Sequence, residues 1–548
     1  MRKRSDLLLS RRRLLGVPVL AALAGALTAC GDEYASPKPP ATGASGGSTP
    51  GAPASGAPAH TPAAVPVPAG TTMRIDNLAK GKHSIEMTVG PVIRVDDSSS
   101  LLKVVAHRPQ DDPGADEQIY PPLPELWLGS QSAENQGTRP LRLVDTANRR
   151  VWVSTQTAEP KDPFVEKGDT NEYYFSFGAI DAGTTRLVAM LSETGFFEVE
   201  VVEAATVPGV DGKALVAAAA PEPNRSAPLD LEFYARAFDG SSGSLTTSKD
   251  VTLSLSGDVT FATDSADLSA TADAGLQVGA LLIKAYPDGG SMTITGHTDD
   301  VAEDAYNLTL SEKRAQTVHQ RLGELVDLSK WQVEVVGKGE TEPKINDTTE
   351  EARAANRRVE VVLTPTGGTK LLPKPDGAAA QVPEPKGPSA TGAAGVKVVD
   401  PHSQDEVTIY LDQVTRRGQV LLGEFRVVGG KVALSSSLNV WFRDSVGSAE
   451  YTARGEKAGL SPFSAASGVT LAVDGQYVFP LDYLPLGADG HRPLAELDLD
   501  EYAQEGKTYR VLVVWPDTGG STVTVDRADD RESHANPWRL TDVPVVEA

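Results

Sequence analysis

The clearest pattern of hydrophobic and polar positions lies between residues 246 and 365, where strand-like and helix-like segments follow one another. Residues alternate with a period of two in four segments, at 250–261, 291–298, 331–339 and 357–363. A helical pattern covers 270–287 and another covers 309–325, where the recurring apolar positions are Ala315, Val318, Leu322 and Leu325. Residues 348–356 predict a short helix or turn. The predicted order, βαβαβ(α)β, is typical of an α/β sandwich.

The start of the second long helix is indicated by Thr309, which Glu312 follows three residues later. This spacing matches a capping box, in which the threonine hydroxyl accepts a hydrogen bond from the first turn of the helix. We therefore expect Thr309 to be the N-cap. The residues between Asp299 and Thr309 are then predicted to form a loop.

Two other long segments, 71–245 and 396–548, contain short strand-like runs separated by polar turns. This pattern of short strands and polar turns predicts a β-sandwich-like domain in each segment. Residues 181–202 and 504–527 share a layout of strand, Glu/Asp-Thr-Gly turn and strand. The shared layout favours the second domain being a copy of the first, although unrelated hairpins show it too. We expect five tryptophans in these domains to lie in cores rather than on ligand platforms: Trp127, Trp152, Trp441, Trp515 and Trp538.

Residues 30–70 and 366–395 are rich in Pro, Ala and Gly and poor in large apolar residues. Because such segments cannot bury enough apolar surface to form a core, we predict two disordered linkers. The fold class is therefore multidomain, with a central α/β domain at 246–365 flanked by two β-sandwich-like domains.

The first 29 residues resemble a bacterial lipoprotein signal peptide. A basic segment precedes an apolar run of about 16 residues, shorter than the ~20 that a membrane-spanning helix needs. The run ends in "LTAC", which places Cys30, the single cysteine of the chain, at a lipobox position. The resemblance implies that Cys30 carries acyl chains such as palmitate and anchors the protein to a membrane. A plain signal peptide with an incidental cysteine is the alternative, and "SRRRLL" also resembles a twin-arginine export signal.

The formal net charge of −23 limits the classes of partner. Nucleic acids and anionic lipids are bound by Lys and Arg that displace counterions, so this acidity argues against both. A single cysteine excludes a disulfide within the chain and a cysteine-based metal site. The composition suits an extracytoplasmic protein.

Asp299 and Arg314 are the most informative charged pair in the sequence. Asp299 follows a predicted strand and Arg314 lies on the next predicted helix, so the two side chains can converge at one edge of the sheet. A carboxylate and a planar guanidinium together suit the ammonium and carboxylate of an amino-acid head group. Thr298 and Asn307 are neutral groups beside them that could orient such a ligand. By spacing alone, however, a solvated salt bridge is the more common outcome.

Residues 246–365 resemble the peptidoglycan-binding domain of the OmpA family. The resemblance rests on ordered motifs: "VTFATDSADL", "ITGHTDD", "AYNLTLSEKRA", "GKGETEP" and "NRRVEVVL". It implies that Asp299 binds the ammonium of diaminopimelate in the peptidoglycan stem peptide and that Arg314 binds its carboxylate. By the same resemblance Thr298 and Asn307 belong to the site.

The same resemblance assigns Arg357 and Arg358 to the site. Alternation along a strand predicts that only one of these two arginines faces the ligand. The chain departs from the family at Ala262, where an acid often stands, although Asp264 remains. This departure puts the affinity for the ligand in doubt.

No sequence feature indicates catalysis, a cofactor or a metal site. His297 is interpreted as a strand-end residue rather than a ligand. The acidic run "ELDLDEY" at 496–502 favours an edge strand over a weak calcium site.

The sequence therefore predicts a membrane-anchored lipoprotein that binds peptidoglycan non-covalently, on the extracytoplasmic side of the cell membrane or in an outer membrane. It would tether membrane to wall or present its flanking domains at the wall. In an alternative hypothesis the β domains bind a protein partner and the central domain is only an anchor. A wall hydrolase is a third hypothesis, which no motif supports.

Overall fold

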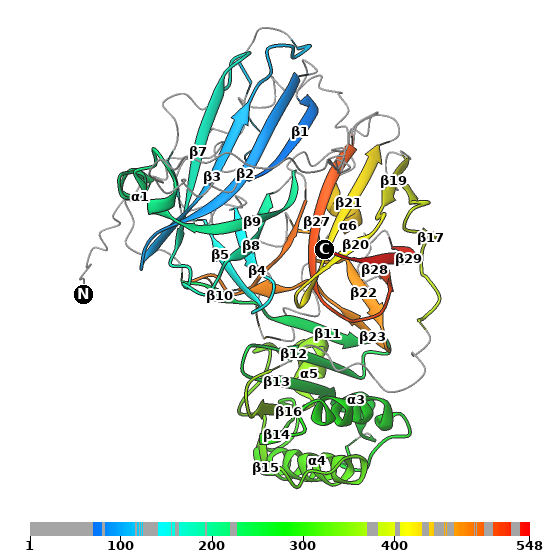
Figure 1. Cartoon of the computed structure of the whole chain (residues 1–548). Helices are drawn as coiled ribbons and strands as arrows, with labels where there is room; N and C mark the ends of the chain where they lie inside the picture. The colour runs from blue at the N-terminus through cyan, green and yellow to red at the C-terminus, as the bar shows by residue number, and fades with distance from the viewer. Residues whose placement is uncertain are drawn as a thin grey trace, which may run out of the picture.

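The structure of the chain is a computed structural model, and Figure 1 shows its three parts. It describes residues 70–78, 83–114, 118–119, 121, 123, 141–154, 156–158, 164–191, 194–219, 227–262, 264–369, 382–399, 406–429, 438–442, 454, 456, 465–486, 488, 490–497, 508–527 and 537–548. Cys30, Trp127, the signal peptide and the predicted linker up to residue 69 lie outside these residues. Within them, no helix is both long and apolar enough to cross a membrane.

The N-terminal part is a ten-stranded sheet with the order β10-β5-β4-β8-β9-β2-β3-β7-β6, and β1 pairs with β2. Its strands are β1 (Thr71–Leu78), β2 (His83–Asp96), β3 (Ser99–His107), β4 (Arg142–Asp145), β5 (Arg150–Val153), β6 (Gln156–Ala158), β7 (Thr170–Gly178), β8 (Arg186–Leu191), β9 (Gly195–Glu203) and β10 (Leu229–Asp230). A 3₁₀ turn, η2 (Ala204–Thr206), and helix α1 (Gly212–Ala219) follow β9.

One strand, β9, joins the two halves of this sheet, because its first residues pair with β8 and its last with β2. Side chains from both halves share one core, including Val104, Phe175, Leu143 and Trp152. The sequence predicted a β-sandwich here. In the structure, the strands on both sides of this core belong to one continuous hydrogen-bonded sheet.

The central part has the predicted alternation of strands and helices. Its elements are β11 (Phe233–Ala237), β12 (Ser242–Thr246), β13 (Val251–Ser256), α2 (Gly257–Thr260), α3 (Ala272–Lys284), β14 (Gly290–His297), α4 (Asp304–Leu325), β15 (Trp331–Gly339), α5 (Glu350–Asn356) and β16 (Arg358–Pro365). The strands β13, β16, β14 and β15 are adjacent, with β14 and β15 parallel and β16 antiparallel to both its neighbours. Helices α3 and α4 pack together and onto these strands around a core that includes Leu253, Ile294 and Val318.

Helix α4 begins five residues earlier than the sequence predicted, so the assignment of Thr309 as N-cap was wrong. The N-cap is Glu303, and the Thr309 hydroxyl donates to the Ala305 carbonyl within the helix at 2.9 Å. The first turn lacks apolar periodicity because Tyr306 and Leu308 face solvent. Asp304 suits the positive end of the helix dipole, which an apolar pattern does not register.

The C-terminal part is again rich in strands. It contains β17 (Ser389–Thr391), β18 (Val396–Val399), β19 (Glu406–Tyr410), β20 (Val414–Arg417), β21 (Val420–Gly429), α6 (Leu438–Phe442), β22 (Thr470–Val473), β23 (Gln476–Val478), β24 (Asp482–Tyr483), β25 (Arg492–Pro493), β26 (Ala495–Glu496), β27 (Thr508–Pro516), β28 (Thr522–Arg527) and β29 (Trp538–Glu547). Trp441, Trp515 and Trp538 are fully buried with Phe425 in its core, and Trp152 is buried in the N-terminal part. The prediction that these four tryptophans lie in cores is confirmed.

Two expectations about the C-terminal region need correction. The predicted linker at 366–395 is not a tether throughout, since β17 pairs in parallel with β29 and Arg539 donates its backbone N–H to Pro388. The strand pairings also do not support duplication. β8 pairs with β9, whereas the registered partners of β27 are β21 and β26 and those of β28 are β22 and β29.

The three parts are joined through shared structure. β11 pairs with β12 of the central part along one edge and with β23 of the C-terminal part along the other. A separate apolar cluster joins the N- and C-terminal parts, in which Val188 and Met190 pack with Leu422, Leu512 and Val514. Figure 1 accordingly shows the central part below the two β-rich parts, which lie side by side.

A buried group of charges lies beside β11. Arg454 is 2.7 Å from Asp482, and His491 is 3.2 Å from Glu232 and 2.6 Å from Glu456. The carboxylates of Glu232 and Asp482 and the ring of His491 are close enough to hold a metal ion, but Arg454 already supplies a cation to both acids. We interpret this group as an ion-pair network that fixes the joint between the parts.

This network predicts a pH-dependent stability. Burial acts to lower the pKa of His491, but hydrogen bonds to Glu232 and Glu456 outweigh it and raise the pKa to about 9. The resulting stabilisation is complete below the ordinary pKa of about 6.5 and is lost as pH rises through about 9. Thermal unfolding should therefore show a fall in stability between about pH 7 and about pH 10, on the order of 3 kcal/mol at most.

The variant His491→Gln isolates this effect. It should be less stable than the parent at neutral pH and should lose the part of the alkaline decline that His491 causes. A decline of equal size in parent and variant would show that His491 is not the titrating group.

Candidate functional site

The site lies where β14 ends and α4 begins. Gly296, near the end of β14, is packed so closely that a Cβ there would lie 2.0 Å from the Ser311 carbonyl oxygen. Gly337 on β15 is in a similar position, 2.6 Å from the Glu312 nitrogen. Because neither glycine has a side chain, α4 lies directly against the ends of these two strands. This close approach brings Asp299, just after β14, to the same edge of the sheet as Arg314 on α4.

Asp299 does not pair with Arg314. One of its carboxylate oxygens accepts a hydrogen bond from Arg357 at 2.8 Å, and the other is 3.4 Å from the Val301 backbone nitrogen. The side chain is 16% exposed, so the carboxylate is largely shielded but accessible. The second oxygen is therefore only weakly engaged and can accept another donor.

Arg357 is held by three carboxylates. It makes two hydrogen bonds to Asp258, at 2.7 and 2.8 Å, and one each to Asp299 and Glu350 at 2.8 Å. The bond to Asp258 is the main cause of a raised pKa of Arg357, which keeps it charged. This arginine fixes the position of the Asp299 carboxylate.

Arg314 is buried and has no carboxylate partner among the described residues. Its Nε donates to the Ser265 carbonyl at 2.9 Å, and its guanidinium lies over the Phe261 ring, 5.0 Å from the centroid. Burial lowers the pKa of Arg314, and the negative charges of Asp258, Asp264 and other neighbours partly oppose this effect. The described residues thus leave a desolvated guanidinium, with the donors on its terminal nitrogens available, beside Asp299.

Asn307 supports the site rather than lining it. Its side-chain nitrogen donates to the backbone carbonyls of Asp299 and Ala302, at 3.2 and 3.1 Å, and to Glu340 at 2.7 Å. The amide therefore fastens the loop after β14 to the first turn of α4. The sequence predicted a ligand-orienting role, and the contacts show a residue that holds the loop.

Thr298 is likewise buried. Its backbone N–H donates to the Gly339 carbonyl at 2.9 Å, while its hydroxyl oxygen has no hydrogen-bond partner within the described part of the chain.

Arg358 points away from Asp299, as strand alternation predicts for one of the two arginines. It donates to Glu360 at 2.8 Å on the side where His297 lies buried. Burial and the charge of Arg358 lower the pKa of His297 to about 4, so the ring is neutral at neutral pH. Arg357 is therefore the one of the pair that reaches Asp299.

The sequence reasoning missed Asp258 and Glu350. Residues 250–261 alternate like a single strand, whereas 257–260 form the short helix α2, which carries Asp258 to Arg357. Glu350 lies in the first turn of α5. Two further acids therefore surround Arg357 even though residue 262 is an alanine.

The run "ELDLDEY" is described only at its start. Glu496 is buried in β26 and bonded to Arg142, and residues 498–502 lie outside the described residues.

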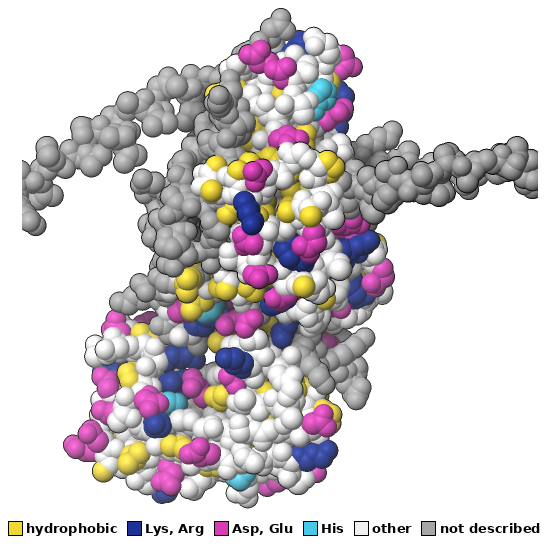
Figure 2. Space-filling model, turned by 60° about the vertical axis from the view of Figure 1, so that its left-hand side comes forward, with side chains coloured by type: hydrophobic (Ala, Val, Ile, Leu, Met, Phe, Trp, Pro, Cys, Tyr) yellow, Lys and Arg dark blue, Asp and Glu magenta, His cyan; other side chains and the backbone are white. Residues whose placement is uncertain are grey.

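The charges on the surface are mixed. On the face that Figure 2 shows, acidic and basic side chains of the described residues are interspersed rather than gathered into one basic area.

The role of Asn307 leads to a prediction. Asn307→Ala removes the donors that hold the Asp299 and Ala302 carbonyls, so the loop should open more often. We expect a loss of about 1–3 kcal/mol in unfolding free energy and faster hydrogen exchange at residues 299–303.

The control is Gln316→Ala on the exposed side of α4, which should change stability by less than about 0.5 kcal/mol. Unchanged exchange in the loop of the Asn307 variant would show that the amide does not hold it.

Comparison with known proteins places this site in a family. Residues 260–357 match the OmpA family. The chain is 41% identical over 103 residues to outer membrane porin F of Pseudomonas aeruginosa, covering 19% of this chain and 29% of that protein. It is 39% identical over 101 residues to a peptidoglycan-associated lipoprotein of Pseudomonas putida, covering 18% and 59%.

A mycobacterial protein and a solved structure are also similar. The peptidoglycan-binding protein ArfA of Mycobacterium bovis is 38% identical over 84 residues, which cover 15% of this chain and 24% of that protein. The crystal structure of the peptidoglycan-associated lipoprotein from Burkholderia pseudomallei is 31% identical, covering 21% of this chain and 88% of that one, with a TM-score of 0.17. The chain spans less than two thirds of the length of these three curated relatives.

Proposed function

Because residues 260–357 form an OmpA-family domain, we propose that this domain binds peptidoglycan non-covalently, by holding the zwitterionic end of diaminopimelate between Arg314 and Asp299. Two of the similar proteins are named for association with or binding to peptidoglycan, which supports the choice of ligand.

The observation that carries the proposal is that the buried guanidinium of Arg314 has no carboxylate partner among the described residues. A buried cation without a counter-charge loses hydration, and the single hydrogen bond to Ser265 and the Phe261 ring replace only part of it. A ligand carboxylate would restore that interaction, with two parallel hydrogen bonds that the planar guanidinium can donate. The Phe261 ring fixes the plane of the guanidinium before the ligand arrives.

Asp299 provides the complementary charge. Arg357 holds one of its oxygens at 2.8 Å, which leaves the weakly engaged oxygen to accept from a ligand ammonium. Arg357 thereby orients the carboxylate without a direct contact to the ligand, and Asp258 and Glu350 balance its positive charge. No bond is made or broken in this scheme, so the function is binding and not catalysis.

The remainder of the proposed function concerns location. We propose that Cys30 is lipidated and anchors the chain to a membrane facing the wall, and that the chain thereby links membrane and peptidoglycan. Because the central part is connected to the C-terminal part by continuous strand pairing, wall binding would also hold the two β-rich parts at the wall.

The first test changes the two ligand-binding charges. In co-sedimentation with insoluble peptidoglycan, Arg314→Gln and Asp299→Asn should each reduce binding at least about tenfold, because each removes a charge-assisted contact. Arg314→Lys should bind less well than the parent because lysine cannot donate in the planar, two-pronged geometry.

The matched control is Arg321→Gln on the same helix, whose guanidinium pairs with Asp273 and Glu324 on the surface. It should sediment like the parent. Parent-like sedimentation of both the Arg314→Gln and the Asp299→Asn variants would refute the site.

A second test changes the ligand instead of the protein. Peptidoglycan in which the side-chain carboxylate of diaminopimelate is amidated carries no charge for Arg314, so the parent should bind it much less well. The Arg314→Gln variant should discriminate little between the two forms. Equal binding of both forms by the parent would show that Arg314 does not receive that carboxylate.

A further inference from the structure

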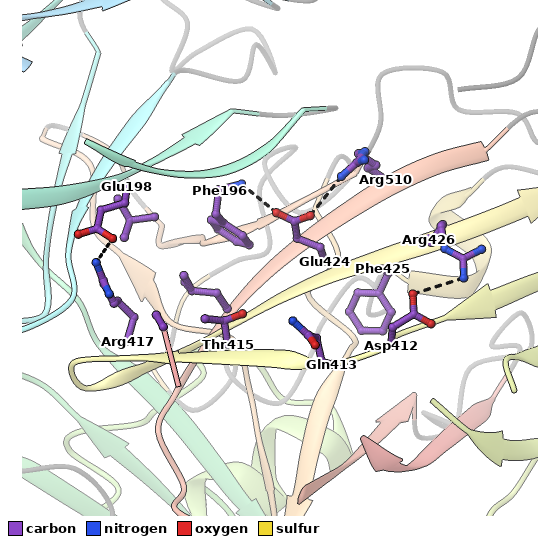
Figure 3. A pocket seen from close by; sticks show the side chains of 13 residues that line it. Phe196, Glu198, Asp412, Gln413, Thr415, Arg417, Glu424, Phe425, Arg426 and Arg510 are labelled. Atoms are coloured by element: carbon purple, nitrogen blue, oxygen red, sulfur yellow. Dashed lines mark hydrogen bonds and ion pairs between the residues drawn. The ribbon is translucent and has the colours of Figure 1, made fainter. Parts of the chain in front are cut away.

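A cavity lies outside the central part, between the N-terminal and C-terminal parts. Its volume is about 670 Å³, within the range of ligand pockets in proteins. One wall comes from β8 and β9 and the other from β20, β21 and β27, as Figure 3 shows. Ligand sites are frequently found at such junctions between folded units.

The cavity forms where the N-terminal part stops covering one face of the sheet that contains β21 and β27. Along β21 and β27, Leu422, Leu512 and Val514 pack against residues of the N-terminal part in a shared core. Further along the same face the residues become Glu424, Arg426 and Arg510, where that apolar contact ends. The cavity is the space at this edge, so its floor is partly apolar and its rim is charged.

The walls are held in place by contacts between the two parts. Glu424 accepts hydrogen bonds from the Phe196 backbone at 3.0 Å and from Arg510 at 3.1 Å. On the opposite side Arg417 pairs with Glu198. Because these bonds join β9 to β20 and β21, and β21 to β27, the cavity is formed before any ligand binds.

The charged side chains that line the cavity neutralise one another. Glu198 pairs with Arg417, Glu424 with Arg510, and Asp412 with Arg426 at 3.4 Å. An ionic ligand would have to separate one of these pairs, whereas a neutral ligand can add hydrogen bonds to the charged groups without doing so. The lining therefore favours an uncharged polar ligand.

Two neutral polar side chains complete the lining. Gln413 lies just before β20 and Thr415 lies in it. Their side chains have no hydrogen-bond partner among the described residues, and Figure 3 shows them between Arg417 and Arg426. Each offers a donor and an acceptor. The partly buried Phe196 and the buried Val188 add apolar surface to the same space.

We propose that this cavity binds a neutral saccharide. Sugar rings present hydroxyl groups at their edges and C–H groups on their faces, which match polar groups that surround an apolar floor. Arg510 and Glu424 would bind hydroxyl groups as donor and acceptor, and Gln413 and Thr415 would bind those at the mouth. This site is distinct from the diaminopimelate site of the central part and does not depend on it.

The test uses the full chain and four uncharged disaccharides as probes: N,N′-diacetylchitobiose, cellobiose, maltose and lactose. Saturation-transfer NMR detects binding, and calorimetric titration measures affinity. At least one probe should bind saturably, and the double variant Gln413→Ala/Thr415→Ala should reduce its affinity at least about tenfold. Since neither side chain has a partner in the described structure, thermal unfolding of the variant should match the parent.

The control double variant is Gln316→Ala/Thr522→Ala, at exposed positions away from the cavity, which should bind like the parent. Arg314→Gln should also keep saccharide binding, which separates this proposal from the proposed function. Failure of all four probes, equal affinity in the Gln413/Thr415 variant, or loss of binding in Arg314→Gln would each overturn the proposal. Tighter binding of glucuronate or of glycylglycine than of the disaccharides would overturn it as well, by showing a site for ions.

Discussion

The strand β11 is hydrogen-bonded along both edges, and the spatial relation of the candidate site to the rest of the molecule depends on this pairing. β12 of the central part lies on one side and β23 of the C-terminal part on the other. A strand paired on both edges cannot slip or rotate without breaking a ladder of backbone hydrogen bonds. The buried network of Glu232, Arg454 and His491 lies next to this joint and resists the same movements.

Within the central part, the two arginines near Asp299 differ in their carboxylate partners. Arg357 is paired with three carboxylates, while Arg314 is buried and has no carboxylate partner among the described residues. Two arginines close to the same aspartate thus have different roles. Arg357 holds the Asp299 carboxylate in place, whereas Arg314 donates from Nε to a backbone carbonyl and has no printed contact to a carboxylate among the described residues.

The cavity between the two β-rich parts differs from the candidate site in how its charges are paired. Its arginines and acids are already paired with one another, so its capacity for a ligand comes from hydrogen bonds and apolar surface rather than from net charge. Both sites depend on contacts between segments far apart in the sequence. The first needs β14, α4 and β16 together, and the second needs β9 from one part and β20 from another.

The sequence by itself determined the element order of the central part, because strand and helix periods alternate clearly there. It also determined that Asp299 and Arg314 lie at one sheet edge, since strand ends and helix starts are neighbours. It failed at Thr309, where a local capping signal lies inside a helix whose first turn has exposed Tyr306 and Leu308. Only the tertiary structure decided that Arg357, not Arg314, pairs with Asp299, and that Asn307 holds a loop. Those assignments depend on distances between side chains of α2, of α4 and of Arg357, which lies between α5 and β16. The periodicity of apolar residues along the chain contains no information about such distances.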